Sequence, residues 1–249
     1  MEILGETAHR PWPLPRGPWV MAQVWHDLLF AHWPISTERM RAAVPRGLEL
    51  DTFEGRAWLG IVPFRMTGVR VRWTPSLPRI SAFPELNVRT YVRCGDRPGV
   101  LFFSLDARNP IAVEIARAWF HLPYFRARMS CERAGDGEEI RYSHVRTHSN
   151  APAAELSGRY RPIGPAFHAR AGTLEHWLIE RYCLYTAPKS RGVWRAEIHH
   201  PPWSLQNAEA SFERNTMALA HGLELQETAP LLHFARRQDV VVWNPVRTS

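Results

Sequence analysis

The chain has 249 residues, with 31 basic and 24 acidic side chains, a formal net charge of +7 and 45% hydrophobic residues. This composition excludes a mostly disordered, collagen-like or disulfide-stapled protein, and the length suits one domain with its own buried core. Three cysteines lie far apart without a CxxC pair, which indicates reduced thiols. No apolar run reaches the roughly 18 residues of a membrane span. We therefore expect a soluble, cytoplasmic protein that does not enter a membrane.

The positive charge is almost entirely arginine, since Lys189 is the only lysine. The arginines are spread along the chain and interleaved with acidic residues. Nucleic-acid binders usually gather their charge in one stripe or tail. We therefore expect no nucleic-acid partner.

The N-terminal third begins with residues 1–18, whose prolines and glycines predict an extended arm. A helix is expected near 36–44, with Ser36 as its N-cap and Pro45 ending it. Apolar or alternating runs then predict two strands, at 58–64 and 69–73.

The middle of the chain predicts a hairpin followed by a helix. Strands at 85–92 and 100–107 flank a turn rich in Gly, Asp and Pro. Asn109 caps the next helix, Pro110 takes its first position and Pro123 ends it. Its expected apolar stripe consists of Ile111, Ile115, and Ala118 or Trp119.

The last part predicts strands at 126–133 and 139–147, joined by a turn at 135–137. A helix at 173–182 and strands near 193–199 and 239–243 follow. There is no internal repeat and no long linker. The sequence therefore predicts one β-rich α+β domain over residues 1–249.

The hairpin strands carry an unusual set of polar residues. Because side chains alternate along a strand, one face of the first strand carries Glu85, Asn87, Arg89 and Tyr91. The matching face of the second strand carries Phe102, Ser104 and Asp106. Pairing about the turn is expected to place Asp106 beside Asn87 or Glu85. The residues alone favour a solvated surface; a face turned inward would hold paired, buried charges and be a ligand site.

Several segments spread over nearly the whole chain resemble one protein family. They are PRGPW (15–19), WHDLLFAHWPI (25–35), AAVPRGLELDTFEG (42–55), FPELNVRTYV (83–92), FFSLDA (102–107), LPYF (122–125), ERYCLYT (180–186) and HHPPWSLQNAE (199–209). With these segments the chain resembles the acetoacetate decarboxylase-like superfamily, and most closely its YqjF-like branch. The resemblance implies a closed, cone-like, mostly antiparallel β-barrel with flanking helices and a central cavity. It also implies that the polar hairpin face points inward.

The resemblance also bears on chemistry. The decarboxylases use a Schiff-base lysine, a second lysine, a glutamate and an arginine. The aromatic-x-Glu motif of the glutamate matches Phe83-Pro84-Glu85, whereas the lysine pair falls on Tyr124 and Phe125. The arginine aligns near Trp25 or His26 and is not kept. Imine chemistry needs a desolvated lysine amine, so we expect no Schiff-base decarboxylation.

Two residues are the candidate catalytic groups: Glu85 as a general base and Tyr124 as an acid. The simpler structural alternatives are a buried ion pair of Glu85 with Arg89, and a core tyrosine. The candidate ligand-binding residues are Arg89, Asn87, Asp106, Arg117 and His26. For Arg117 an ion pair with Glu114 on the same helix is the simpler account.

The expected function is that of a cytosolic protein whose barrel cavity binds a small organic acid or ketone, with lysine-independent acid–base chemistry as one option. The alternatives are a non-catalytic binding or sensing module, or a structural subunit of a homo-oligomer. His144 and His148 have i, i+4 spacing, but their segment is predicted to be a strand, so they would not share a helical face. No nucleotide or serine-hydrolase motif occurs. We therefore expect no metal and no cofactor.

Overall fold

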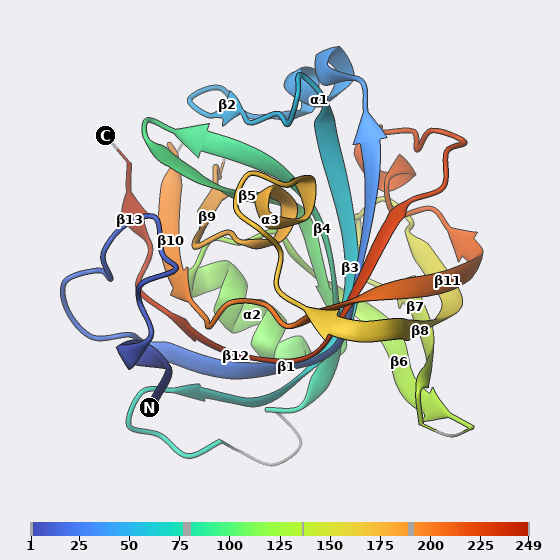
Figure 1. The fold of residues 1–249 in the computed structure, drawn as a ribbon, viewed down its shortest axis with the longest axis horizontal. Helices are drawn as coiled ribbons and strands as arrows, with labels where there is room; N and C mark the ends of the chain where they lie inside the picture. Colours follow the sequence, from blue (N-terminus) through green and yellow to red (C-terminus); the bar gives the residue numbers. More distant parts are fainter. Residues whose placement is uncertain (1, 77–80, 136, 189–191, 249) are drawn as a thin grey trace.

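The computed structural model describes residues 2–76, 81–135, 137–188 and 192–248. In this part of the chain, thirteen strands pair into one sheet, accompanied by three short α-helices, of which α1 (Thr37–Ala43) lies at the outer edge of the molecule (Figure 1). The strands are β1 (Met21–Ile35), β2 (Glu49–Leu50), β3 (Ala57–Val71), β4 (Phe83–Cys94), β5 (Arg97–Ala107), β6 (Tyr124–Ala134), β7 (Glu139–Arg146), β8 (Glu155–Phe167), β9 (Cys183–Thr186), β10 (Trp194–His199), β11 (Leu205–Asn215), β12 (Leu231–Val242) and β13 (Val246–Arg247). The helices are α1 (Thr37–Ala43), α2 (Pro110–Trp119) and α3 (Leu174–Ile179), with 3-10 turns η1 (Glu2–Gly5) and η2 (Leu219–His221).

Five strands form a central sheet in the order β12-β1-β3-β4-β5. The outer edge of β5 is divided between two parallel partners, β9 for its first half and β6 for its second. The outer edge of β12 is likewise divided between β10 and β11. The segment β6-β7-β8-β11 therefore runs from one edge of the central sheet to the other, and so does the segment β9-β10. The sheet is ring-like, with two rings that share the central strands.

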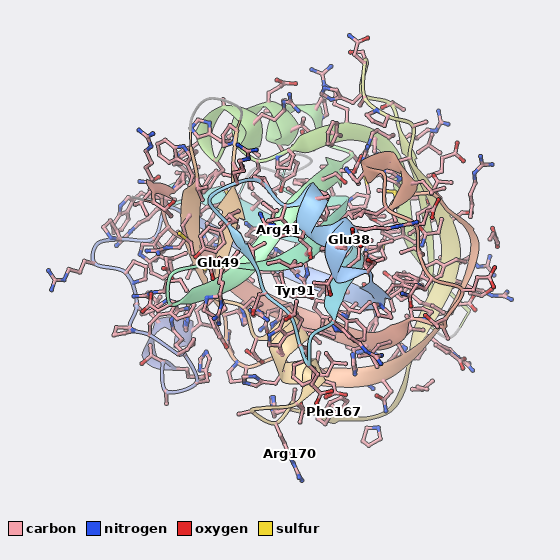
Figure 2. The ribbon with its side chains drawn as sticks, turned by 90° about the horizontal axis from the view of Figure 1, so that it is seen from above. Glu38, Arg41, Glu49, Tyr91, Phe167 and Arg170 are labelled. Carbon is pink, nitrogen blue, oxygen red and sulfur yellow. The ribbon has the colours of Figure 1, made fainter. Side chains whose placement is uncertain are left out.

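Each face of the central sheet contributes to its own hydrophobic core. Leu29, Leu59 and Val88 pack in one core with residues of β6, β7 and β8. Phe30 and Val62 pack in the other with residues of α2, α3, β9 and β10. Figure 2 shows Tyr91, a fully buried residue of this second core, near the middle of the molecule. Adjacent residues of a central strand thus enter different cores, and the polar residues Glu85, Asn87 and Arg89 of β4 are buried among apolar neighbours.

A residue with left-handed backbone conformation in β1 changes the core that the following side chains of the strand face. Asp27 has φ +54°, a conformation that Asp tolerates better than most residues. Its buried carboxylate accepts hydrogen bonds from Arg133 (2.6 Å) and Arg65 (3.0 Å), and its carbonyl accepts one from the Tyr160 hydroxyl. Because the chain is kinked there, Trp25 and Leu28 line the same cavity although they are three residues apart.

A second irregularity lies in the hairpin of β4 and β5. Val88 pairs with Ser104, but Arg89 pairs with Phe102, so Phe103 is an extra, bulged residue. The bulge reverses the alternation of β5, and Asp106 pairs with Leu86. The expected position of Asp106 beside Asn87 or Glu85 is therefore wrong.

The structure confirms the β-rich single domain with few helices that the sequence predicts. The Ser36 and Asn109 caps are present, and Asn109 accepts from two backbone amides of α2. The strands expected at 58–64 and 69–73 are one strand, β3, and most of β1, β8 and β11 was not foreseen. The prediction that Ile111 and Ile115 form the buried apolar stripe of α2 is also wrong, because these side chains are 55% and 48% exposed. Of the turn expected at 135–137, residue 136 lies outside the described residues.

The buried ion pair of Asp106 with Arg146 can be tested by mutation. Arg146 donates to both of its carboxylate oxygens, at 2.7 and 2.8 Å, and both side chains are buried. We expect Asp106→Asn to lower the free energy of unfolding by about 3–5 kcal/mol, because the buried guanidinium loses its counter-charge. Denaturant unfolding measures the loss. Asp239→Asn, which breaks the exposed pair with Arg237, is the control and should change stability by about 0.5 kcal/mol or less.

Candidate functional site

A cavity of about 100 Å³ lies in the second core, against the face of the central sheet that carries Glu85, Asn87 and Arg89. These side chains point to one side because they alternate along β4. Tyr124 reaches the same cavity from the start of β6, where it pairs with Leu105 of β5, another lining residue. The predicted polar face is therefore buried and lines a cavity.

Glu85 and Tyr124 form a hydrogen-bonded pair. The Tyr124 hydroxyl donates to Oε2 of Glu85 at 2.8 Å, and Glu85 is 3% exposed. Burial raises the pKa of Glu85 to about 8; the Tyr124 hydrogen bond opposes this shift, and the charge of Asp106 adds to it. Burial also raises the pKa of Tyr124 well above its usual value. At neutral pH Glu85 is therefore protonated, and it becomes a base only when it loses that proton.

Arg89 is a buried cation without a counter-charge among the described residues. Its side chain lies over the rings of Phe30 (5.4 Å) and Tyr91 (5.9 Å). Its Nε and Nη2 atoms are buried without a hydrogen-bond partner in the described part of the chain, and so is Oδ1 of Asn87. The structural alternative for Glu85 was an ion pair with Arg89. The described residues form no such ion pair. An unpaired buried guanidinium is costly unless a ligand supplies the anion.

Arg181 enters the cavity from the segment after α3. Its Nη1 donates to Asp51 at 2.7 Å and its Nε to the carbonyl of Trp177, whereas Nη2 has no partner among the described residues. Burial lowers the pKa of Arg181, and Asp51 offsets part of that shift. His200 lines the cavity nearby, and burial lowers its pKa to about 4, so the imidazole is neutral at pH 7.

Aliphatic and aromatic side chains form the rest of the wall. Trp203 stacks on Trp25 with ring centres 6.0 Å apart and meets Phe30 edge-on at 5.0 Å. Phe64 packs edge-on against Trp25 at 5.6 Å. The site therefore combines two guanidinium groups and a neutral carboxyl with an apolar, aromatic enclosure, which suits a partly apolar anion.

Three of the predicted ligand-binding residues lie elsewhere. Asp106 faces the other core with Arg146. Arg117 is exposed, and its Nη1 donates to the Tyr124 carbonyl at 2.6 Å. His26 is half-buried, and its Nε2 lies 2.8 Å from the hydroxyl of Thr67. None of the three lines this cavity.

Sequence reasoning missed Arg181, His200 and Trp203 as cavity residues. They lie in the segments 180–186 and 199–209, which carry the family resemblance, but no local pattern shows which side they face. Tyr124 and Phe125 occupy the positions where the resemblance places lysines, and Lys189 lies outside the described residues. Within the described ranges, no group of three or more His, Cys, Asp or Glu residues could hold a metal ion. No helix in those ranges is long and apolar enough to cross a membrane.

The ring-like sheet and its cavity define an acetoacetate decarboxylase-like fold. The chain is similar to the solved acetoacetate decarboxylase of Legionella pneumophila subsp. pneumophila str. Philadelphia 1, with a TM-score of 0.61 and 13% identity over 98% of this chain and 93% of that one. It is also similar to the enduracididine biosynthesis enzyme MppR, with a TM-score of 0.63 and 10% identity over 92% of this chain and 89% of that one. At these identities the likeness concerns the fold alone.

The family is shown by sequence. Residues 22–239 match the model of the family DUF2071, described as "Uncharacterized conserved protein (COG2071)", and the chain belongs to this family. It is 48% identical over 234 residues to the "Uncharacterized protein YqjF" of Bacillus subtilis (strain 168), which covers 94% of both chains. The YqjF-like resemblance expected from the sequence is thus confirmed.

The pKa of Glu85 predicts a pH effect on stability. The folded carboxyl has a pKa of about 8 against 4.5 for the free side chain, so the folded state binds more protons between these values. Stability from this group is therefore complete below pH 4.5 and falls as the pH rises toward 8, by up to about 1.4 kcal/mol per pH unit. Glu85→Gln should lose this decline, so its stability relative to the wild type should increase from pH 5 to pH 8.

Denaturant unfolding of both proteins at pH 5, 6, 7 and 8 checks the effect. The difference between them removes contributions from other titrating groups, such as His200. A constant difference over this range would contradict the raised pKa. Glu114→Gln, at an exposed carboxylate, is the matched control and should leave the slope as in the wild type.

Proposed function

We propose that the cavity binds a small, partly apolar organic acid whose carboxylate is held by Arg89. The observation that carries this proposal is the buried guanidinium of Arg89, with Nε and Nη2 unpartnered among the described residues. A guanidinium offers two parallel N–H groups to one carboxylate, so a bound acid would satisfy both the charge and the donors.

Other features of the site support the same ligand class. Arg181 adds a second guanidinium, and Trp25, Phe30 and Trp203 provide the apolar wall. The ring-like pairing of the strands favours a closed, cone-like barrel around the cavity. Among proteins of similar fold, MppR has been solved as a complex with pyruvate.

Arg89→Met tests the proposal through ligand-induced stabilisation. The wild type should gain roughly 2.7 kcal/mol at an acid concentration 100 times the dissociation constant, which raises Tm by several degrees. Pyruvate, butyrate and 4-oxopentanoate are the probes, with their amides as uncharged controls. Arg89→Met should weaken binding at least tenfold, whereas Arg128→Met, at an exposed arginine of β6 that does not line the cavity, should bind as the wild type.

The stability of the unliganded variant distinguishes ligand binding from a structural role. Removing an unpaired buried cation should leave the free energy of unfolding unchanged or raise it. A structural arginine would instead destabilise the protein when replaced. If Arg89→Met is destabilised and acids bind it as well as they bind the wild type, the proposal is wrong.

The hydrogen-bonded pair of Glu85 and Tyr124 favours a second candidate function, acid–base catalysis on the bound acid. Ionised Glu85 would take a proton from a carbon next to a ketone, and the enolate would regain a proton from the protonated carboxyl. No lysine takes part, so no imine is formed. A protein that binds acids without such exchange would be a binding or sensing module.

Proton exchange measures this chemistry directly. With 4-oxopentanoate in D₂O, NMR should show loss of the protons next to the ketone, faster as the pH rises toward 8, and Glu85→Gln should abolish it. Tyr124→Phe removes the hydrogen bond that lowers the pKa of Glu85, so the pH profile should move upward. Exchange that is equal in Glu85→Gln and the wild type would rule out this role.

A further inference from the structure

An apolar groove lies outside the cavity, between α2 and the strands β1 and β3. It has a volume of about 220 Å³ and is lined mainly by apolar side chains, among them Met66, Val69, Ile111 and Ile115. The two isoleucines are exposed on α2, which opens with Pro110 and buries only Val113 completely. Large apolar side chains gathered on a surface usually mark a binding site.

The groove and the cavity meet. Met21, Gln23, Ala116 and Tyr124 line both. The two polar residues among them already have partners: the Tyr124 hydroxyl donates to Glu85, and Oε1 of Gln23 accepts from the indole of Trp25 at 2.8 Å. The side chains that the two spaces share therefore offer apolar contacts and no unpaired charge.

Another surface depression adjoins the cavity at Phe102 and Leu122. It is also lined by Arg117, His121 and Thr186. Arg70, Thr74 and Asn109 line the groove beside α2, but polar atoms make up a smaller share of the surface of that groove. An alkyl or aryl group leaving the cavity is better accommodated by the groove, since burial of apolar surface is favourable only where the surroundings are apolar too.

The polar residues of the cavity lie in a definite order along β4. Each residue of a strand advances by about 3.3 Å, so the Cα atoms of Glu85 and Arg89 are about 13 Å apart. Glu85 contacts Tyr124, which lies where the cavity meets the groove, and Arg89 lies four residues further along the strand. A ligand held by Arg89 must therefore be elongated to reach the groove.

We propose that the physiological ligand is an amphipathic carboxylate, with its acid group at Arg89 and an alkyl or aryl tail that passes Tyr124 into the groove of Ile111 and Ile115. This inference rests on the proposed function, because it assumes that Arg89 binds the acid. It adds the substrate class: a medium-chain or aryl-substituted acid instead of a two- or three-carbon one.

Calorimetric titration with butyrate, hexanoate, octanoate and decanoate tests the inference. Affinity should rise with chain length by about fourfold for each methylene buried in the groove. The double variant Ile111→Gln/Ile115→Gln should weaken octanoate binding at least tenfold and leave butyrate binding unchanged, because butyrate is too short to reach the groove. Glutamine keeps the helix propensity of α2. Ile163→Gln, at an exposed isoleucine outside the groove, is the matched control and should bind every acid as the wild type.

The outcomes separate this inference from the proposed function. If short acids bind through Arg89 but affinity does not rise with chain length, or rises equally in the groove variant, the tail does not occupy the groove and the inference is wrong. If no acid binds, or Arg89→Met binds all of them, the proposed function itself fails. A dimer in sedimentation that the groove variant dissociates would assign the groove to a second copy of the chain and overturn the inference.

Discussion

The central sheet is buried on both faces, and this constraint governs every polar residue that it carries. Apart from Val71 and Arg93 near the strand ends, the residues of β1, β3 and β4 are buried or half-buried, so a charge there must find a partner in one of two cores. The kink at Asp27 and the bulge at Phe103 decide which core each side chain enters. They allow Trp25, Leu28 and residues of β5 to share the wall of one cavity, which strict alternation would prevent.

Most buried charges of the protein have a partner of opposite charge. Asp27 is held by Arg65 and Arg133, Asp51 by Arg181, and Asp106 by Arg146. Glu85 avoids the cost by binding a proton, as its raised pKa shows. Arg89 lies in the same sheet, has no such partner among the described residues, and faces the cavity. Within the described part of the chain, the one buried charge without such a partner therefore faces the cavity, which is why we propose that a ligand pairs with Arg89.

Sequence patterns predict well what short-range chemistry determines. The caps Ser36 and Asn109, the β4–β5 hairpin and the shared face of Glu85, Asn87 and Arg89 follow from neighbouring residues. Polar residues interrupt the apolar pattern of β1, and the strand is kinked at Asp27, so it lacks a regular alternation and most of it was missed. The side of Asp106 depends on one bulged residue, and Arg181 reaches the cavity only through tertiary pairing. No sequence periodicity carries that information.

Two features oppose stability or solubility, and one ligand accounts for both. An unpaired guanidinium at Arg89 disfavours the empty folded state, and exposed isoleucines on α2 favour unwanted association. A core built for stability alone would use a neutral residue at 89 and polar residues at 111 and 115. These features lie in two adjacent spaces that share four lining residues, and the Glu85–Tyr124 pair lies where the spaces adjoin. A carboxylate with an apolar tail would pair with the Arg89 guanidinium and cover the exposed isoleucines. Both unfavourable features are therefore consistent with selection for ligand binding.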